Sequence, residues 1–144
     1  MAEKFELASK PWFDELFRLF RETALEHPEI TFSVCEVFTG VPARLSPDAK
    51  GQIAWRGFIR SGMADLALGE VTPEEVDIKT IADWQSTVPF ARMKIDLADP
   101  KEFARYMEMA DAAAAEGKMQ RFGDRTKVPL VFVEIHNALA DRTA

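Results

Sequence analysis

The sequence has a single cysteine, no long apolar run and no surplus of positive charge, and each absence excludes a class of protein. Cys35 is alone, so no internal disulfide can form, which fits a reducing compartment. No stretch reaches the length of a membrane span, and the charged first residues do not resemble a signal peptide. The net charge of -6 disfavours binding to nucleic-acid phosphates. We therefore expect a cytoplasmic protein with no nucleic-acid partner and no membrane span.

What the sequence contains is typical of one globular domain. Its 144 residues are too few for two ordinary domains and enough for a sizeable core. The hydrophobic fraction of 47% and the charged fraction of 29% argue against disorder. Repeats and low-complexity linkers are absent, so we expect residues 1–144 to form a single domain.

Apolar residues recur at helical spacing near the start of the chain. The pattern predicts an amphipathic helix that begins near Ser9 as N-cap and ends before Pro28. Its apolar positions are Trp12, Phe13, Leu16, Phe17, Phe20 and Leu25.

The middle of the chain changes to a period of two, which predicts strands. Ser61-Gly62 is a turn signal between two of them. We expect these strands to form an antiparallel meander with one face toward a core. The predicted strands are Thr31–Thr39, Gln52–Arg60, Met63–Leu68 and Val76–Ala82, with Lys118–Phe122 as a shorter last one.

Helical signals return after the strands. Asp83 stands where an N-cap belongs, and Pro89 is expected to make the later part of that short segment irregular. Asp99-Pro100-Lys101-Glu102 opens a helix that runs to about Glu116 and stops at Gly117. Val128–Ala140 is the last, apolar helix. The predicted fold is α+β, with a mostly antiparallel five-stranded sheet covered on one face by helices, the N-terminal helix first and the C-terminal helix last.

Two stretches carry a family resemblance. Ile53–Arg92 runs strand, turn, strand and then VDIKTIADWQSTVPFAR, and GKMQRFGD at residues 117–124 is a Gly-Lys-apolar strand closed by Gly-Asp. In this order of parts, residues 30–140 resemble the sterol-carrier-protein-2-like (SCP2-like) lipid-binding domain. The resemblance implies an apolar tunnel between sheet and helices that holds sterols, fatty acyl chains or other lipids without a cofactor. The helix Pro100–Glu116 departs from the family, which usually has a short link there.

Histidine and cysteine give no metal site. His27 and His136 are far apart and form no recognisable ligand set with Cys35. We interpret His136 as a partly buried histidine with one backbone partner, His27 as a helix C-terminal residue and Cys35 as a small buried strand residue.

Carboxylates are the only credible acid–base groups. Glu36, Asp65 and Asp77 lie on predicted strands, and a carboxylate in an apolar pocket would have a raised pKa and could act as an acid or a base. Asp65 and Asp77 occupy the polar phase of their strands, which indicates a solvated face. Arg56, Gln85 or Tyr106 could orient a polar group of a ligand.

The apolar residues suggest a cavity once the resemblance is considered. By type alone they would more often fill a core, but methionine and aromatic side chains also suit adaptable ligand sites. We expect the segments Trp84–Met93 and Pro100–Glu116 to cover the cavity. The expected ligand-binding residues are Trp55, Trp84, Val88, Phe90, Met93, Phe103, Tyr106, Met107, Met119 and Phe132.

Three functions stay open at this point. The first is a carrier that binds an apolar small molecule and needs no cofactor. The second is a cofactor-independent isomerase or hydrolase that acts on a steroid-like or aromatic substrate in the same cavity. The third is an interaction module, for instance a homodimer. An inward carboxylate or histidine would favour the enzyme, a uniformly apolar tunnel the carrier, and a filled core with an exposed apolar patch the interaction module.

Overall fold

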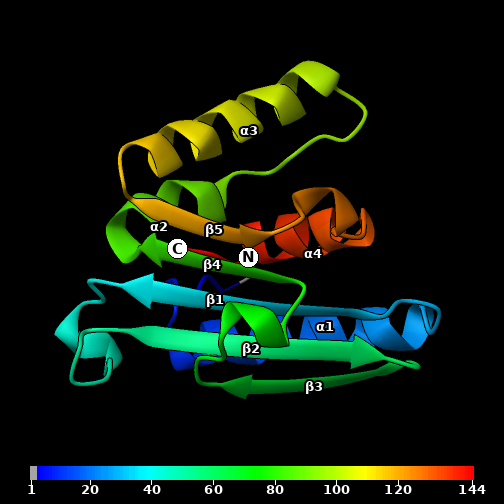
Figure 1. The fold of residues 1–144 in the computed structure, drawn as a ribbon, viewed down its shortest axis with the longest axis horizontal. Helices are drawn as coiled ribbons and strands as arrows, with labels where there is room; N and C mark the ends of the chain where they lie inside the picture. Colours follow the sequence, from blue (N-terminus) through cyan, green and yellow to red (C-terminus); the bar gives the residue numbers. More distant parts are fainter. Residues whose placement is uncertain (1–2) are drawn as a thin grey trace.

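The computed structural model describes residues 3–144 and confirms an α+β fold with a helix first and a helix last (Figure 1). None of the described helices is long and apolar enough to cross a membrane. The helices are α1 (Lys10–Glu26), α2 (Trp84–Arg92), α3 (Pro100–Ala115) and α4 (Val131–Ala140), and the strands are β1 (Phe32–Thr39), β2 (Ile53–Arg60), β3 (Met63–Leu68), β4 (Ile78–Asp83) and β5 (Met119–Gly123).

The five strands form one sheet in the order β3-β2-β1-β4-β5. Three of the four neighbouring pairs are antiparallel, but β1 and β4 run parallel. The predicted meander is therefore wrong in one respect. A meander would place β4 beside β3, whereas here β4 pairs with the opposite side of the β1–β2–β3 hairpins. The chain therefore crosses the sheet between β3 and β4.

That crossing covers the outer face of the sheet. The segment after β3 includes the short 3-10 helix η2 (Pro73–Glu75), which lies in front of the strands in Figure 1, with α1 behind them. Lys79 on β4 donates to the Glu70 carboxylate at 2.5 Å and to the Val71 carbonyl at 2.9 Å. Cys35 is fully buried, and burial raises the pKa of its thiol. The predicted structural role of Cys35 is consistent with this burial.

The inner face of the sheet packs on α1 and α4 through aromatic side chains. Trp55 on β2 is 1% exposed, and its ring lies 5.4 Å from that of Phe20 on α1. Phe132 on α4 contacts the rings of both Phe20 and Phe32, at 5.1 and 5.3 Å. Leu66 pairs with Gly57, two residues from Trp55, and so faces the same side as predicted.

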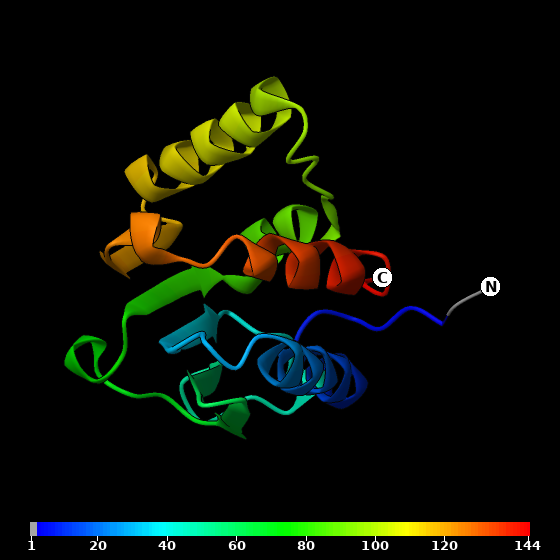
Figure 2. The same cartoon turned by 90° about the vertical axis from the view of Figure 1, so that its right-hand side faces the viewer.

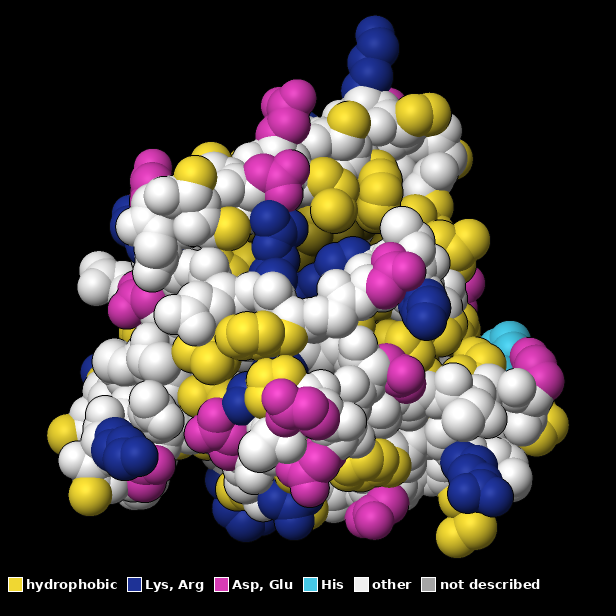
Figure 3. Space-filling model, in the orientation of Figure 1, with side chains coloured by type: hydrophobic (Ala, Val, Ile, Leu, Met, Phe, Trp, Pro, Cys, Tyr) yellow, Lys and Arg dark blue, Asp and Glu magenta, His cyan; other side chains and the backbone are white. Residues whose placement is uncertain are grey.

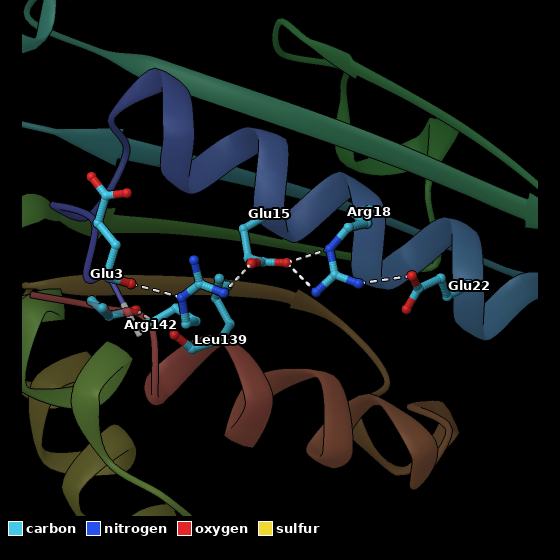
Figure 4. Close-up of polar contacts among 7 residues, drawn as sticks. Glu3, Glu15, Arg18, Glu22, Leu139 and Arg142 are labelled. Carbon is cyan, nitrogen blue, oxygen red and sulfur yellow. Dashed lines mark hydrogen bonds and ion pairs between the residues drawn. The ribbon is translucent and has the colours of Figure 1, made fainter. Parts of the chain in front are cut away.

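An ion-pair cluster joins α1 to the end of the chain (Figure 4). The Glu15 carboxylate is only 8% exposed, and Arg18 and Arg142 both pair with it, Arg142 at 3.0 Å. Arg142 also donates to the Glu3 carbonyl at 2.7 Å. Because a buried carboxylate needs such partners, the cluster fixes α4 and the C-terminal residues against α1.

Local signals located the helix starts well. Ser9, Asp83 and Asp99 each cap a helix with a side-chain oxygen, as predicted. Two boundaries differ. α2 continues through Pro89, because the Gln85 carbonyl that loses its helical donor belongs to an exposed residue that water can reach. α4 begins at Val131 rather than Val128, because Arg125–Lys127 form the 3-10 helix η3 and Pro129 follows it.

Helix α3 lies beyond the β5 edge of the sheet rather than on its inner face (Figures 1 and 2). It leads directly into β5 through Gly117, whose φ of 77° is the left-handed conformation that glycine adopts readily. The Tyr106 ring joins it to α2 and α4 through edge contacts with Phe90 and His136, each at 5.7 Å. This placement leaves space between α3, the sheet and α4.

We predict that Trp55→Ala lowers the free energy of unfolding by about 3–5 kcal/mol, because a fully buried indole is lost and a cavity remains. Urea denaturation followed by circular dichroism measures the change. Leu25→Ala is the control, since Leu25 is 74% exposed and should change stability by no more than about 0.5 kcal/mol. Equal effects of the two substitutions would contradict this assignment of the core.

Candidate ligand pocket

The structure contains a pocket in two adjoining parts, the larger of which lies beneath α3. One part, about 270 Å³, lies between the sheet, α1 and α4, and the other, about 420 Å³, lies between the sheet, α3 and α4. Figure 3 shows the hollow under α3, with hydrophobic side chains inside and Lys or Arg atoms at its edge. The two parts share nine lining residues: Glu36, Thr80, Thr87, Phe90, Tyr106, Arg125, Val128, Phe132 and His136.

The walls at both ends of the pocket are mainly apolar. Core residues such as Leu16, Phe20 and Trp55 line the part next to α1. Phe103 and Met107 of α3 line the other part, together with Met119 of β5. The shared middle differs, because six of its nine residues carry a polar or titratable side chain.

Glu36 is the carboxylate in this polar middle. On β1 it shares the inner face with Val34 and Phe38. Across the sheet it pairs with Trp55 on β2 and with Thr80 on β4. It lines both parts of the pocket. Burial raises the pKa of the Glu36 carboxyl, while the charge of Arg125 and the indole N–H of Trp55 act in the opposite direction. No hydrogen bond of normal geometry connects that N–H to another described residue.

Arg125 supplies the positive charge. It lies on η3 and donates from Nη2 to the Thr80 hydroxyl. Its buried Nε has no hydrogen-bond partner among the described residues. Burial lowers the pKa of Arg125, and the charge of Glu36 opposes that shift. The guanidinium remains charged, so the middle of the pocket holds one cation beside one carboxyl group.

Tyr106 and His136 complete the polar middle from two helices. Burial, and then the nearby Glu36, raise the pKa of Tyr106 to about 12, so the phenol keeps its proton. The His136 Nε2 lies 2.6 Å from the Met93 carbonyl. Since a carbonyl only accepts, this nitrogen carries the proton. Burial lowers the pKa of His136, so the ring is neutral near pH 7. His136 has the single backbone partner that the sequence analysis predicted.

Seven of the ten residues expected to bind a ligand line the pocket and three do not. Trp84 donates its indole N–H to the Leu7 carbonyl at 2.9 Å, Val88 packs against the hydrophobic core, and Met93 offers only its carbonyl, to His136. Trp84 and Val88 lie on α2, whose residues Thr87 and Phe90 line the pocket instead. The seven that line it are Trp55, Phe90, Phe103, Tyr106, Met107, Met119 and Phe132.

The sequence analysis missed Arg125 and Thr80. Arg125 lies between the predicted strand Lys118–Phe122 and the predicted helix Val128–Ala140, where no element was predicted. Thr80 lies on the predicted strand Val76–Ala82, but its pairing with Glu36 across the sheet was not predicted. Arg56 and Gln85, considered as orienting groups, line neither part of the pocket: Arg56 donates to the Leu68 carbonyl, and Gln85 is exposed. Asp65 and Asp77 are exposed, as predicted.

Within residues 3–144, His, Cys, Asp and Glu nowhere gather in a group of three or more that could hold a metal ion. The pocket offers a hydrogen-bonding centre between apolar walls.

Comparison with solved structures places the fold among SCP2 domains. The chain is similar to a conserved hypothetical protein of Thermus thermophilus, TT1886, described as a candidate sterol carrier protein, with a TM-score of 0.50 and 14% identity over 99% of this chain and 94% of that one. Less similar is UbiJ-SCP2, a ubiquinone synthesis protein, with a TM-score of 0.45 and 13% identity over 94% of this chain and 97% of that one. A sterol carrier protein 2 has a TM-score of 0.40 and 17% identity over 95% of this chain and 92% of that one. The chain has the SCP2-like fold.

Neither a protein-family model nor a curated protein matches the sequence.

We predict that His136 makes stability depend on pH. Its pKa is lowered in the folded state, so below the ordinary value of 6.5 the unfolded chain binds more protons and stability falls as the pH falls. His136→Gln keeps a donor for the Met93 carbonyl and should remove this dependence, at most about 1.4 kcal/mol per pH unit.

Urea denaturation between about pH 7.5 and pH 5.5 tests this. His27→Gln is the control, because His27 caps the C-terminus of α1 near the surface. An unchanged pH slope in His136→Gln, or an equal change in His27→Gln, would contradict the prediction.

Proposed function

We propose that this protein binds a lipid-like small molecule in the pocket between the sheet, α3 and α4, as a carrier does. The observation that supports it best is the pocket itself, two adjoining spaces of about 270 and 420 Å³ in an SCP2-like fold. Volumes of this order are typical of small-molecule sites. Burial of the ligand's apolar surface would supply most of the binding free energy, about 25 cal/mol per Å².

The inner side of α3 supports this proposal. Phe103, Tyr106, Met107 and Ala110 face the pocket instead of filling it. Phe103 remains 38% exposed although it is a large apolar residue. An apolar ligand under α3 would cover surface that the protein alone leaves uncovered.

A second candidate function is an acid–base enzyme that uses the same pocket. The inward Glu36, whose pKa burial raises, is the observation that favours it, and it meets the criterion given above for an enzyme, whereas the pocket is not the uniformly apolar tunnel expected of a carrier. Together with the Tyr106 phenol as a hydrogen-bond donor, such a carboxylate could move a proton next to a substrate carbonyl. Mass spectrometry of the ligands after incubation distinguishes the two functions, since a carrier returns each ligand unchanged.

The carrier function predicts that apolar ligands raise the melting temperature. A ligand at a hundred times its dissociation constant adds about 2.7 kcal/mol of stability, and each kcal/mol corresponds to roughly 2–4 °C for a domain of this size. A thermal-shift panel of sterols, fatty alcohols, fatty acids and acyl esters measures the effect.

Ala110→Phe is the variant that separates pocket binding from surface adsorption. Ala110 is buried on α3 and lines the pocket, so a phenyl ring there should occupy the ligand's space and abolish the shift. Ala112→Phe, on an exposed position of the same helix, should keep it. Shifts that persist in Ala110→Phe, or no shift with any ligand in the unmodified protein, would contradict the proposal.

A further inference from the structure

The middle of the pocket holds a carboxyl group and a guanidinium, which is unusual for a site built to hold an apolar molecule. Glu36 and Arg125 line both parts of the pocket, and each influences the other's pKa. A buried charge is costly unless it is paired and hydrogen-bonded. Any ligand that spans the two parts must therefore satisfy both groups.

The protein satisfies the hydrogen-bonding capacity of these two groups only in part. Arg125 donates from Nη2 to the Thr80 hydroxyl, whereas its buried Nε has no partner among the described residues. On the other side of Glu36, the Trp55 N–H likewise makes no hydrogen bond of normal geometry. By contrast, Glu15 on α1 is fully engaged by Arg18 and Arg142. Glu36 and Arg125 retain capacity for a ligand.

We propose that Glu36 makes the pocket selective for ligands with an uncharged head that both donates and accepts a hydrogen bond, such as an alcohol, over those with a carboxylate. This inference rests on the proposed binding function. A hydroxyl can donate to the Glu36 carboxylate and accept from the Arg125 guanidinium without any change of charge. A ligand carboxylate accepts from Arg125 equally well but meets the like charge of Glu36.

The repulsion between a ligand carboxylate and the Glu36 carboxylate is removed only when one of them takes up a proton. Like charges brought together in a desolvated site repel each other strongly, so either Glu36 or the ligand must be protonated on binding. The other charged or titratable groups that line the pocket do not take over this role. Arg125 and Arg121 are cations, Arg121 being paired with Asp111 at 2.7 Å, Tyr106 is already protonated, and the His136 Nε2 proton is held by the Met93 carbonyl.

The test compares 1-decanol with decanoate, which share a chain and differ in the head. Isothermal titration calorimetry at about pH 9 should give tighter binding of the alcohol, because burial raises the pKa of the Glu36 carboxyl and a high pH favours its charged form. Glu36→Gln removes the negative charge with little change in shape and should strengthen decanoate binding at least about tenfold relative to decanol. Glu134→Gln, an exposed glutamate on α4, is the matched control and should change neither affinity.

A second measurement needs no variant. Repeating each titration in buffers of different ionisation enthalpy counts the protons taken up: about one for decanoate and none for decanol. Decanoate that binds the unmodified protein as tightly as decanol without proton uptake would overturn the inference and leave the binding function standing. Failure of both ligands to bind would overturn the binding function and the inference with it. A Glu36→Gln protein that folds but keeps the original preference would likewise overturn the inference.

Discussion

The parallel pairing of β1 with β4 is the constraint on which the rest of the structure depends. The register of this pair sets Glu36 beside Thr80 on the inner face, and the Thr80 hydroxyl then receives Arg125 from η3. If β4 followed β3 as in a meander, these groups would lie at opposite edges of the sheet. The same pairing forces the crossing after β3, which covers Cys35 and the Lys79 ammonium on the outer face. Both faces of the central strands are therefore buried, although only one is covered by α-helices.

Two buried glutamates show how the protein separates stability from binding. Glu15 is enclosed by Arg18 and Arg142, and this cluster fastens the C-terminal residues to α1. Glu36 pairs across the sheet with Trp55, whose indole N–H makes no normal hydrogen bond, and Arg125 donates to Thr80 rather than to Glu36. Satisfied buried charges hold a structure together, whereas incompletely satisfied ones are typical of sites that receive a ligand. The first glutamate is structural, and the second is the feature of the pocket that an apolar core would not contain.

Helix α3 determines the shape of the pocket because it lies beyond the sheet edge. Instead of packing on the inner face, it continues into β5 and meets α2 and α4 through the edge contacts of Tyr106. The space beneath it is bounded by aromatic and methionine side chains, whose shapes adapt to different apolar surfaces. A more regular packing of α3 would bury Phe103 and close the larger part of the pocket. The position of this helix therefore leaves the larger part of the pocket open.

The sequence by itself determined the local structure. Capping side chains located the helix starts at Ser9, Asp83 and Asp99, and the period of two located β3 at Met63–Leu68 without error. Seven of the ten aromatic, methionine and valine residues that the sequence indicated as ligand contacts line the pocket.

Only the tertiary structure decided the partners of β1 and the polar centre of the pocket. In the middle of β1 both phases are mainly apolar, since Phe32, Val34 and Phe38 occupy one phase and Cys35 and Val37 the other. A period of two says which residues share a face, but it cannot say which face meets the helices when both are buried. Arg125 reaches Thr80 across 45 residues of sequence. Such a contact leaves no local pattern, because it exists only once the chain has crossed its own sheet.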